Sequence, residues 1–151
     1  MPSPLINNIL VLDEMPTIAL GLQGIFSTFH ESIHIEHIEN IFTALGSRAY
    51  EGKRFELAVI GEQLGSPSDD LLRRIAELQH RFGPMKIMVY SPNYDHTLLE
   101  KIEITGIDAY VHKYESIEEI RKAFACLLAG ESYISPIYRT LYYEYGLNMR
   151  K

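Results

Sequence analysis

The sequence predicts an α/β fold in which a five-stranded parallel sheet is doubly wound, with helices on both faces. Short apolar runs that do not alternate with polar residues recur along the chain, as expected of strands that are buried on both faces. Between these runs lie longer segments in which apolar residues return every three or four positions, the spacing of an amphipathic helix. Strands that alternate with helices form parallel sheets with right-handed crossovers.

The central strand is expected at residues 57–60, where Leu-Ala-Val-Ile is an uninterrupted apolar run. Further strands are expected at residues 8–12, 33–38, 85–90 and 109–112. The second of the five alternates imperfectly, with His34 and Glu36 between apolar residues, which is typical of a strand at the sheet edge. Because the chemistry of open parallel sheets collects at the carboxyl ends of the strands, the residues found there are the candidate site.

Helical spacing predicts five connecting helices. Pro16 suits the first turn of a helix whose apolar face extends to Phe29, and further helices are expected at about residues 41–50, 68–82 and 98–106. In the fifth, Ser116 and Glu119 have the spacing of a capping box, and Gly130 suits the carboxyl end. The apolar face of this helix is predicted to comprise Ile117, Ile120, Phe124, Leu127 and Leu128.

Composition limits where the chain acts and what it binds. The 151 residues carry a formal charge of −6, which disfavours direct binding to the phosphate backbone of nucleic acid. The single cysteine, Cys126, excludes an internal disulfide. No apolar run approaches the roughly 18 residues that a membrane span needs, and no export signal is recognisable. We therefore expect a cytoplasmic protein that does not bind membranes.

Residues 1–136 are expected to form one domain, and residues 137–151 a tyrosine-rich extension. In the extension Tyr138, Leu141, Tyr142 and Tyr145 fall at helical spacing, which predicts a short additional helix. Its aromatic residues either pack on their own domain or form a surface for a partner.

Polar residues or a glycine follow four of the predicted strands: Asp13 with Glu14, then Gly61, Ser91 and Lys113. Each has an ordinary structural interpretation. The acidic pair suits a turn before a helix, Ser91 can cap the backbone before Pro92, and Lys113 can form an ion pair with Asp13.

Three histidines invite a metal-site interpretation, namely His30, His34 and His37. Residues three apart on a strand point to opposite faces, however, so His34 and His37 cannot readily chelate one ion. We interpret all three as surface residues.

In this order and spacing, the strand-end residues resemble the receiver domain of bacterial two-component response regulators, which has a flavodoxin-like or CheY-like fold. The chain is most similar to the LuxR/NarL/FixJ-type branch, which is fused to a helix-turn-helix. The resemblance covers about residues 8–136. The segments that carry it are Leu12 to Pro16 with Gly21 and Leu22, Val89 to Pro92, Gly106 to Lys113, and Ala129 to Pro136.

The resemblance implies a role for each residue. Asp13 and Glu14 correspond to the acidic pair that helps to hold Mg²⁺, Ser91 and Lys113 to the contacts of the phosphoryl oxygens, and Tyr110 to the switch aromatic. The position of the phosphoacceptor aspartate is Gly61, which has no side chain to phosphorylate. Glu62, the next residue, would project to the other side of the strand.

We therefore expect a degenerate, phosphorylation-independent pseudo-receiver that is not an enzyme and needs no cofactor, with at most weak Mg²⁺ binding at Asp13 and Glu14. It would act as a protein-interaction or dimerisation module in signal transduction and transcription regulation, pairing with itself or with another response regulator. Such receivers often pair through the first and fifth helices, or through the face of the fourth helix, fifth strand and fifth helix.

Three alternatives stay open at this point. Glu62 or Asp13 could serve as a non-standard phosphoacceptor, which would make the chain an active receiver. A small ligand could fill the space above Gly61. The residues could also be the receiver part of a longer DNA-binding regulator.

Overall fold

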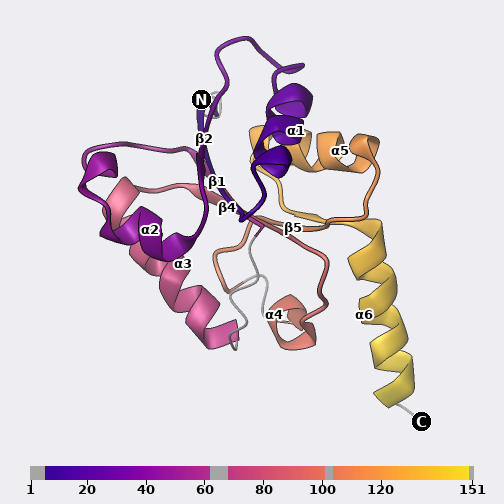
Figure 1. The fold of residues 1–151 in the computed structure, drawn as a ribbon. Helices are drawn as coiled ribbons and strands as arrows, with labels where there is room; N and C mark the ends of the chain where they lie inside the picture. Colours follow the sequence, from indigo (N-terminus) through magenta and orange to yellow (C-terminus); the bar gives the residue numbers. More distant parts are fainter. Residues whose placement is uncertain (1–5, 62–67, 101–103, 150–151) are drawn as a thin grey trace.

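The computed structural model describes residues 6–61, 68–100 and 104–149. In this part of the chain, six strands form one parallel sheet in the order β2-β1-β3-β4-β5-β6 (Figure 1). The strands are β1 (Asn8–Leu12), β2 (His34–Ile38), β3 (Leu57–Ile60), β4 (Lys86–Ser91), β5 (Ala109–His112) and β6 (Tyr133–Ile134). The predicted α/β class, the parallel sheet and the edge position of β2 are confirmed.

The helices are α1 (Pro16–Phe26), α2 (Ile41–Gly46), the 3-10 helix η1 (Arg48–Tyr50), α3 (Ser68–Phe82), α4 (His96–Glu100), α5 (Ile117–Leu128) and α6 (Pro136–Met149). The segment predicted as one helix at 41–50 divides at Ser47, whose carbonyl accepts a hydrogen bond from Arg81 Nη2 at 2.6 Å. Ile102, which was expected in the fourth helix, lies outside the described residues. None of the described helices is long and apolar enough to span a bilayer.

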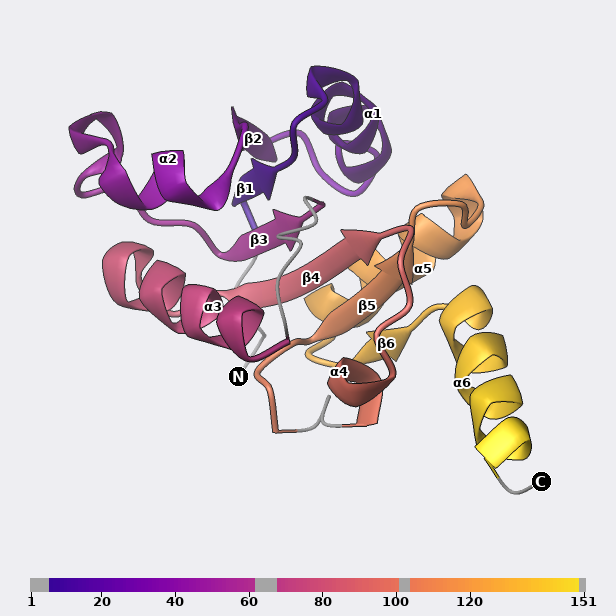
Figure 2. The same ribbon diagram turned by 60° about the horizontal axis from the view of Figure 1, so that its bottom comes forward.

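Each strand sends alternate side chains to opposite faces of the sheet, and each face has its own apolar cluster. On one face Val11, Val59 and Val111 pack beneath α1 and α5, which are joined by stacking of Phe26 on Phe124 at 4.3 Å. On the other face Leu12 and Ile60 belong to the cluster that α2, α3 and α4 cover. Figures 1 and 2 show these two layers of helices on either side of the sheet.

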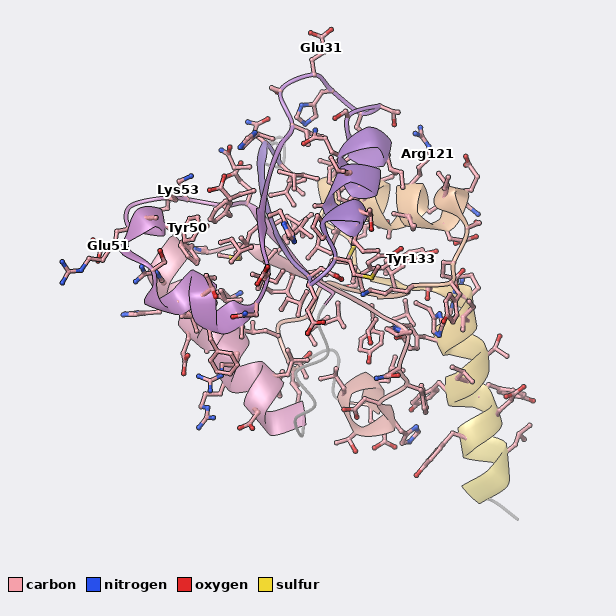
Figure 3. The ribbon with its side chains drawn as sticks, viewed as in Figure 1. Glu31, Tyr50, Glu51, Lys53, Arg121 and Tyr133 are labelled. Atoms are coloured by element: carbon pink, nitrogen blue, oxygen red, sulfur yellow. The ribbon has the colours of Figure 1, made fainter. Side chains whose placement is uncertain are left out.

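The sheet has one strand more than predicted. After α5 the chain forms the two-residue strand β6, which pairs in parallel with β5 through Ala109 and Tyr110. The hydroxyl of Tyr133, a residue labelled in Figure 3, donates a hydrogen bond to Glu119 of α5, so β6 is also fixed to the helix before it. A two-residue strand has no recognisable hydrophobic period, which is why sequence reasoning missed it.

The fifth helix confirms its predicted ends but not its whole apolar face. Ser116 Oγ accepts a hydrogen bond from the amide of Glu119 at 3.2 Å, and Gly130 leaves the helix with a φ of 79°. Ile117, however, is 61% exposed, whereas Ile120 is 4% exposed. The prediction for Ile117 was wrong because the first residue of the helix lies beyond the sheet that covers the later turns.

Replacing these two isoleucines separately should distinguish the buried from the exposed position. Ile120→Ala should lower the free energy of unfolding by about 2–5 kcal/mol, since it leaves a cavity beside the sheet. Ile117→Ala, on the same helix, should change it by less than about 0.5 kcal/mol. Urea denaturation of both variants measures the difference, and equal losses would contradict the observed orientation of α5.

Candidate functional site

The predicted site residues at the ends of β1 and β5 form a buried ion pair. Lys113 Nζ lies 2.7 Å from Asp13 Oδ2, and Asp13 is only 2% exposed. The two residues are brought together because β1 and β5 end at the same edge of the sheet, on either side of β3 and β4. The structural interpretation of Lys113 as the ionic partner of Asp13 is confirmed.

The Asp13 carboxylate lies in the space above Gly61. A Cβ added at Gly61 would be 2.2 Å from Asp13 Oδ2 and 3.1 Å from Asp13 Cγ, well inside van der Waals contact. The amide of Gly61 donates to the carbonyl of Leu12 at 2.8 Å, which holds the two strand ends together. The absent side chain at position 61 thus leaves room that Asp13 fills.

Two further hydrogen bonds fix Asp13. Its Oδ1 accepts from the amide of Met15 at 2.9 Å, and its backbone carbonyl accepts from His37 Nε2 at 2.6 Å. The prediction that His37 is simply a surface residue was wrong. Its ring is half-buried and reaches from β2 to the end of β1, a contact that depends on strand pairing and has no signal in the sequence.

The arrangement does not suit Mg²⁺. Glu14 is exposed and makes no hydrogen bond or ion pair with any described residue, while Asp13 is already bound to Lys113. Gly61 offers no carboxylate. Within the described ranges, no three His, Cys, Asp or Glu side chains gather closely enough to hold a metal ion. Magnesium needs oxygen ligands in near-octahedral geometry, and the described residues around Asp13 do not provide them.

Ser91 connects the group formed by Asp13, Gly61 and Lys113, called the Asp13–Lys113 pocket below, to the rest of the sheet edge. Its hydroxyl accepts from the amide of Asn93 at 3.1 Å, the turn role that the sequence suggested. Its carbonyl oxygen accepts two donors, the amide of Lys113 at 3.1 Å and the hydroxyl of Tyr138 at 2.5 Å.

Tyr110 is buried on β5 and contacts the ring of Tyr138 edge-on, with centroids 4.3 Å apart. Burial raises the pKa of both phenols, that of Tyr138 to about 12. Tyr138 belongs to the same apolar cluster as the sheet, so part of the tyrosine-rich extension packs on its own domain. Helical spacing placed Tyr138 correctly on a helix but gave no sign that it would be fully buried.

The ammonium of Lys113 lies 5.9 Å from the ring centroid of Tyr90, within the range of a cation–π contact. Burial, and then the negative charge of Asp13, raise the pKa of the Tyr90 phenol. Tyr90 therefore stays neutral at physiological pH and provides an apolar wall beside the ion pair.

Comparison with solved structures identifies the architecture. A two-component response regulator of the LuxR family from Aurantimonas sp. SI85-9A1 superposes with a TM-score of 0.72 at 17% identity, over 95% of this chain and 99% of that one. The chain has the receiver fold. A LuxR family DNA-binding response regulator from Silicibacter pomeroyi gives a TM-score of 0.67 at 16% identity, over 87% and 98% of the two chains.

The isolated receiver domain of RcsB from Salmonella enterica serovar Typhimurium, solved with the phosphomimetic BeF3⁻, gives a TM-score of 0.68 at 17% identity over 91% of this chain and 99% of that one. No protein-family model and no curated protein matches the sequence. The TM-scores establish the shared fold. At identities this low, the role of each residue has to be argued from the geometry of the site.

The close approach of the Asp13 carboxylate to Gly61 predicts that even an added methyl group at position 61 lowers stability. Gly61→Ala should destabilise the protein by about 1–3 kcal/mol, because the new methyl group displaces an Asp13 carboxylate that Lys113 and Met15 hold in place. Gly24→Ala is the matched control. Gly24 is exposed in α1 with no atom within 4 Å of an added Cβ, so alanine there should stabilise by about 0.5–1 kcal/mol. Chemical denaturation would contradict the fit if Gly61→Ala were as stable as the parent.

Proposed function

We propose that this chain is a phosphorylation-independent receiver domain that acts as a protein-interaction module in signal transduction and transcription control. The observation that carries the proposal is the Asp13 carboxylate above Gly61, bound to Lys113. In this arrangement the lysine that the resemblance assigns to a phosphoryl group already has an anionic partner within the chain. Control by phosphate is replaced by control through association.

The two rival mechanisms find less support. As a phosphoacceptor, Asp13 would have to leave the ion pair and become accessible, although both of its carboxylate oxygens are engaged. Glu62 lies outside the described residues. A small ligand above Gly61 would have to displace the Asp13 side chain from the space that it fills.

The surroundings of β5 favour one of the two expected pairing surfaces. β6 pairs along the outer edge of β5, and Tyr138 of α6 covers Tyr110 and His112. A face made by α4, β5 and α5 is thereby occupied by the carboxyl-terminal segment of the same chain, as Figure 2 illustrates. We propose that a second copy binds instead at α1 and α5.

Four large apolar side chains are exposed within or shortly before the first five residues of these two helices: Met15, Leu20, Tyr114 and Ile117. Apolar patches of this kind mark interaction sites, because water contact with them is unfavourable. The structural neighbours include a LuxR family DNA-binding regulator and RcsB dimers bound to DNA, which supports a place in transcription control, with DNA contacted by another domain or chain.

Exposure to a small phosphodonor tests the proposed mechanism. Incubation with acetyl phosphate and Mg²⁺ should leave the intact mass unchanged, since both carboxylate oxygens of Asp13 are engaged and Gly61 offers no carboxylate. A stoichiometric phosphoryl adduct would overturn the proposal. Repeating the measurement with Asp13→Asn and with Glu62→Gln would then assign the acceptor.

Charge substitution tests the pairing surface. Leu20 is 72% exposed, so Leu20→Glu should leave stability nearly unchanged while weakening self-association at least tenfold, as expected when a charge enters an apolar contact. Phe42→Glu is the control, because Phe42 is also exposed but lies on α2 at the opposite face. Sedimentation over a concentration series measures the dissociation constant. A monomeric parent, or equal loss in both variants, would contradict the α1–α5 assignment.

A further inference from the structure

Tyr138 is the residue through which α6 is anchored. It is the only side chain of the described part of α6 that is fully buried, and its hydroxyl is directed at the carbonyl oxygens of Ser91 (2.5 Å) and Asn93 (2.6 Å). Both carbonyls belong to the segment that leaves β4. A buried hydroxyl needs such partners, since an unpaired polar group in the core is costly.

The same carbonyl of Ser91 also belongs to the Asp13–Lys113 pocket. It accepts the backbone amide of Lys113 at 3.1 Å, and the side chain of Lys113 holds Asp13 above Gly61. One carbonyl group is therefore shared by the anchor of α6 and the residue that closes the pocket. Displacing either donor changes the position of the acceptor on which the other depends.

Ring contacts provide a second connection. The Tyr138 ring packs on Tyr110 at 4.3 Å and on His112 at 5.1 Å between centroids. Both residues lie on β5, and His112 directly precedes Lys113. A shift of Tyr138 therefore changes the packing of the strand that positions the lysine.

The rest of α6 is less buried than Tyr138: Leu141 packs partly buried against the same apolar cluster, and the amide of Ile137 donates a hydrogen bond to Glu115 at 2.6 Å. Tyr145 and Tyr142 stack on His96 of α4 at 3.7 and 5.1 Å, and the outer face is open, with Tyr143 66% exposed. Figure 1 shows the helix extending away from the sheet toward the carboxyl terminus. A helix with a single buried anchor can dock and undock as a unit.

We propose that docking of α6 and closure of the Asp13–Lys113 pocket are energetically coupled, with Tyr138 as the coupling residue. The pocket that the resemblance assigns to phosphate sensing becomes, in this chain, a sensor of whether α6 is docked. A protein partner that draws α6 off the sheet would weaken the ion pair, and an event that opens the ion pair would release the helix. Coupling of this kind is reciprocal. This inference rests on the proposed function in one respect: both assume that no phosphoryl group takes part in the switch.

Amide hydrogen exchange of the unliganded protein tests both directions, using Tyr138→Phe, Lys113→Met and the double variant. Tyr138→Phe keeps the ring and removes the hydroxyl, and it should speed exchange about fivefold in residues 109–115 as well as in α6. Lys113→Met should speed exchange of α6 by a similar factor, although no hydrogen bond, ion pair or cation–π contact joins Lys113 to the described part of that helix. In the double variant the two effects should combine less than additively. Tyr143→Phe, on the exposed face, is the matched control and should change neither region.

Residues 70–82 of α3, which covers the same face of the sheet as Tyr138 but is separated from α6 by α4 (Figures 1 and 2), report global opening. The coupling is supported if Lys113→Met speeds amide exchange in α6 but not in α3. It is overturned if α6 is unaffected, or if α3 and α6 speed up equally. Should Lys113→Met fail to fold, Asp13→Asn breaks the same pair without a change in size and is read by the same criteria. Because no phosphodonor is used, failure here leaves the phosphorylation test of the proposed function untouched.

Discussion

The pocket depends on a buried charge pair that only a glycine at position 61 allows. Removing two charges from water is costly, and a buried pair persists only where each partner is close and the remaining polar atoms are bonded. Asp13 meets this requirement through Lys113, the amide of Met15 and the ring of His37. Any side chain at position 61 would enter the volume of the carboxylate. The glycine at position 61 and the ion pair are thus two aspects of one packing arrangement.

The segments β6 and α6 pack against the same edge of the sheet as this ion pair. β6 covers the open edge of β5, and α6 places Tyr138 against Tyr110 and beneath the segment leaving β4. Backbone groups at an exposed strand edge invite pairing with other chains, so the closure of β5 removes one natural site of association. The helices α1 and α5 keep exposed apolar residues at or near their first turns. The proposed self-association would therefore use the side of the molecule formed by α1 and α5.

The main strands and most helix ends were predictable because the signals are local: unbroken apolar runs for the sheet, a serine cap and a glycine stop for α5. The exposure of Ile117 was not, because hydrophobic periodicity does not reveal where a helix projects beyond its sheet. The position of Asp13 above Gly61 could not be predicted from the sequence either. A motif shows which side chain is missing, whereas the three-dimensional packing decides which neighbour takes its place. The contact of His37 with the Asp13 carbonyl likewise arises from strand pairing alone.

An apolar pair could fill the space over Gly61 at least as stably, because replacing a buried ion pair by packed hydrophobic residues is often neutral or stabilising. The ion pair differs from an apolar pair in the free energy that is needed to separate its two side chains. Separating two apolar side chains exposes a little surface, whereas moving Lys113 leaves a carboxylate that is 2% exposed without its counter-charge. The proposed coupling therefore treats the closed arrangement as one discrete state. In that proposal, a small displacement at the shared Ser91 carbonyl favours one of two arrangements, which is the physical requirement for coupling the ion pair to α6.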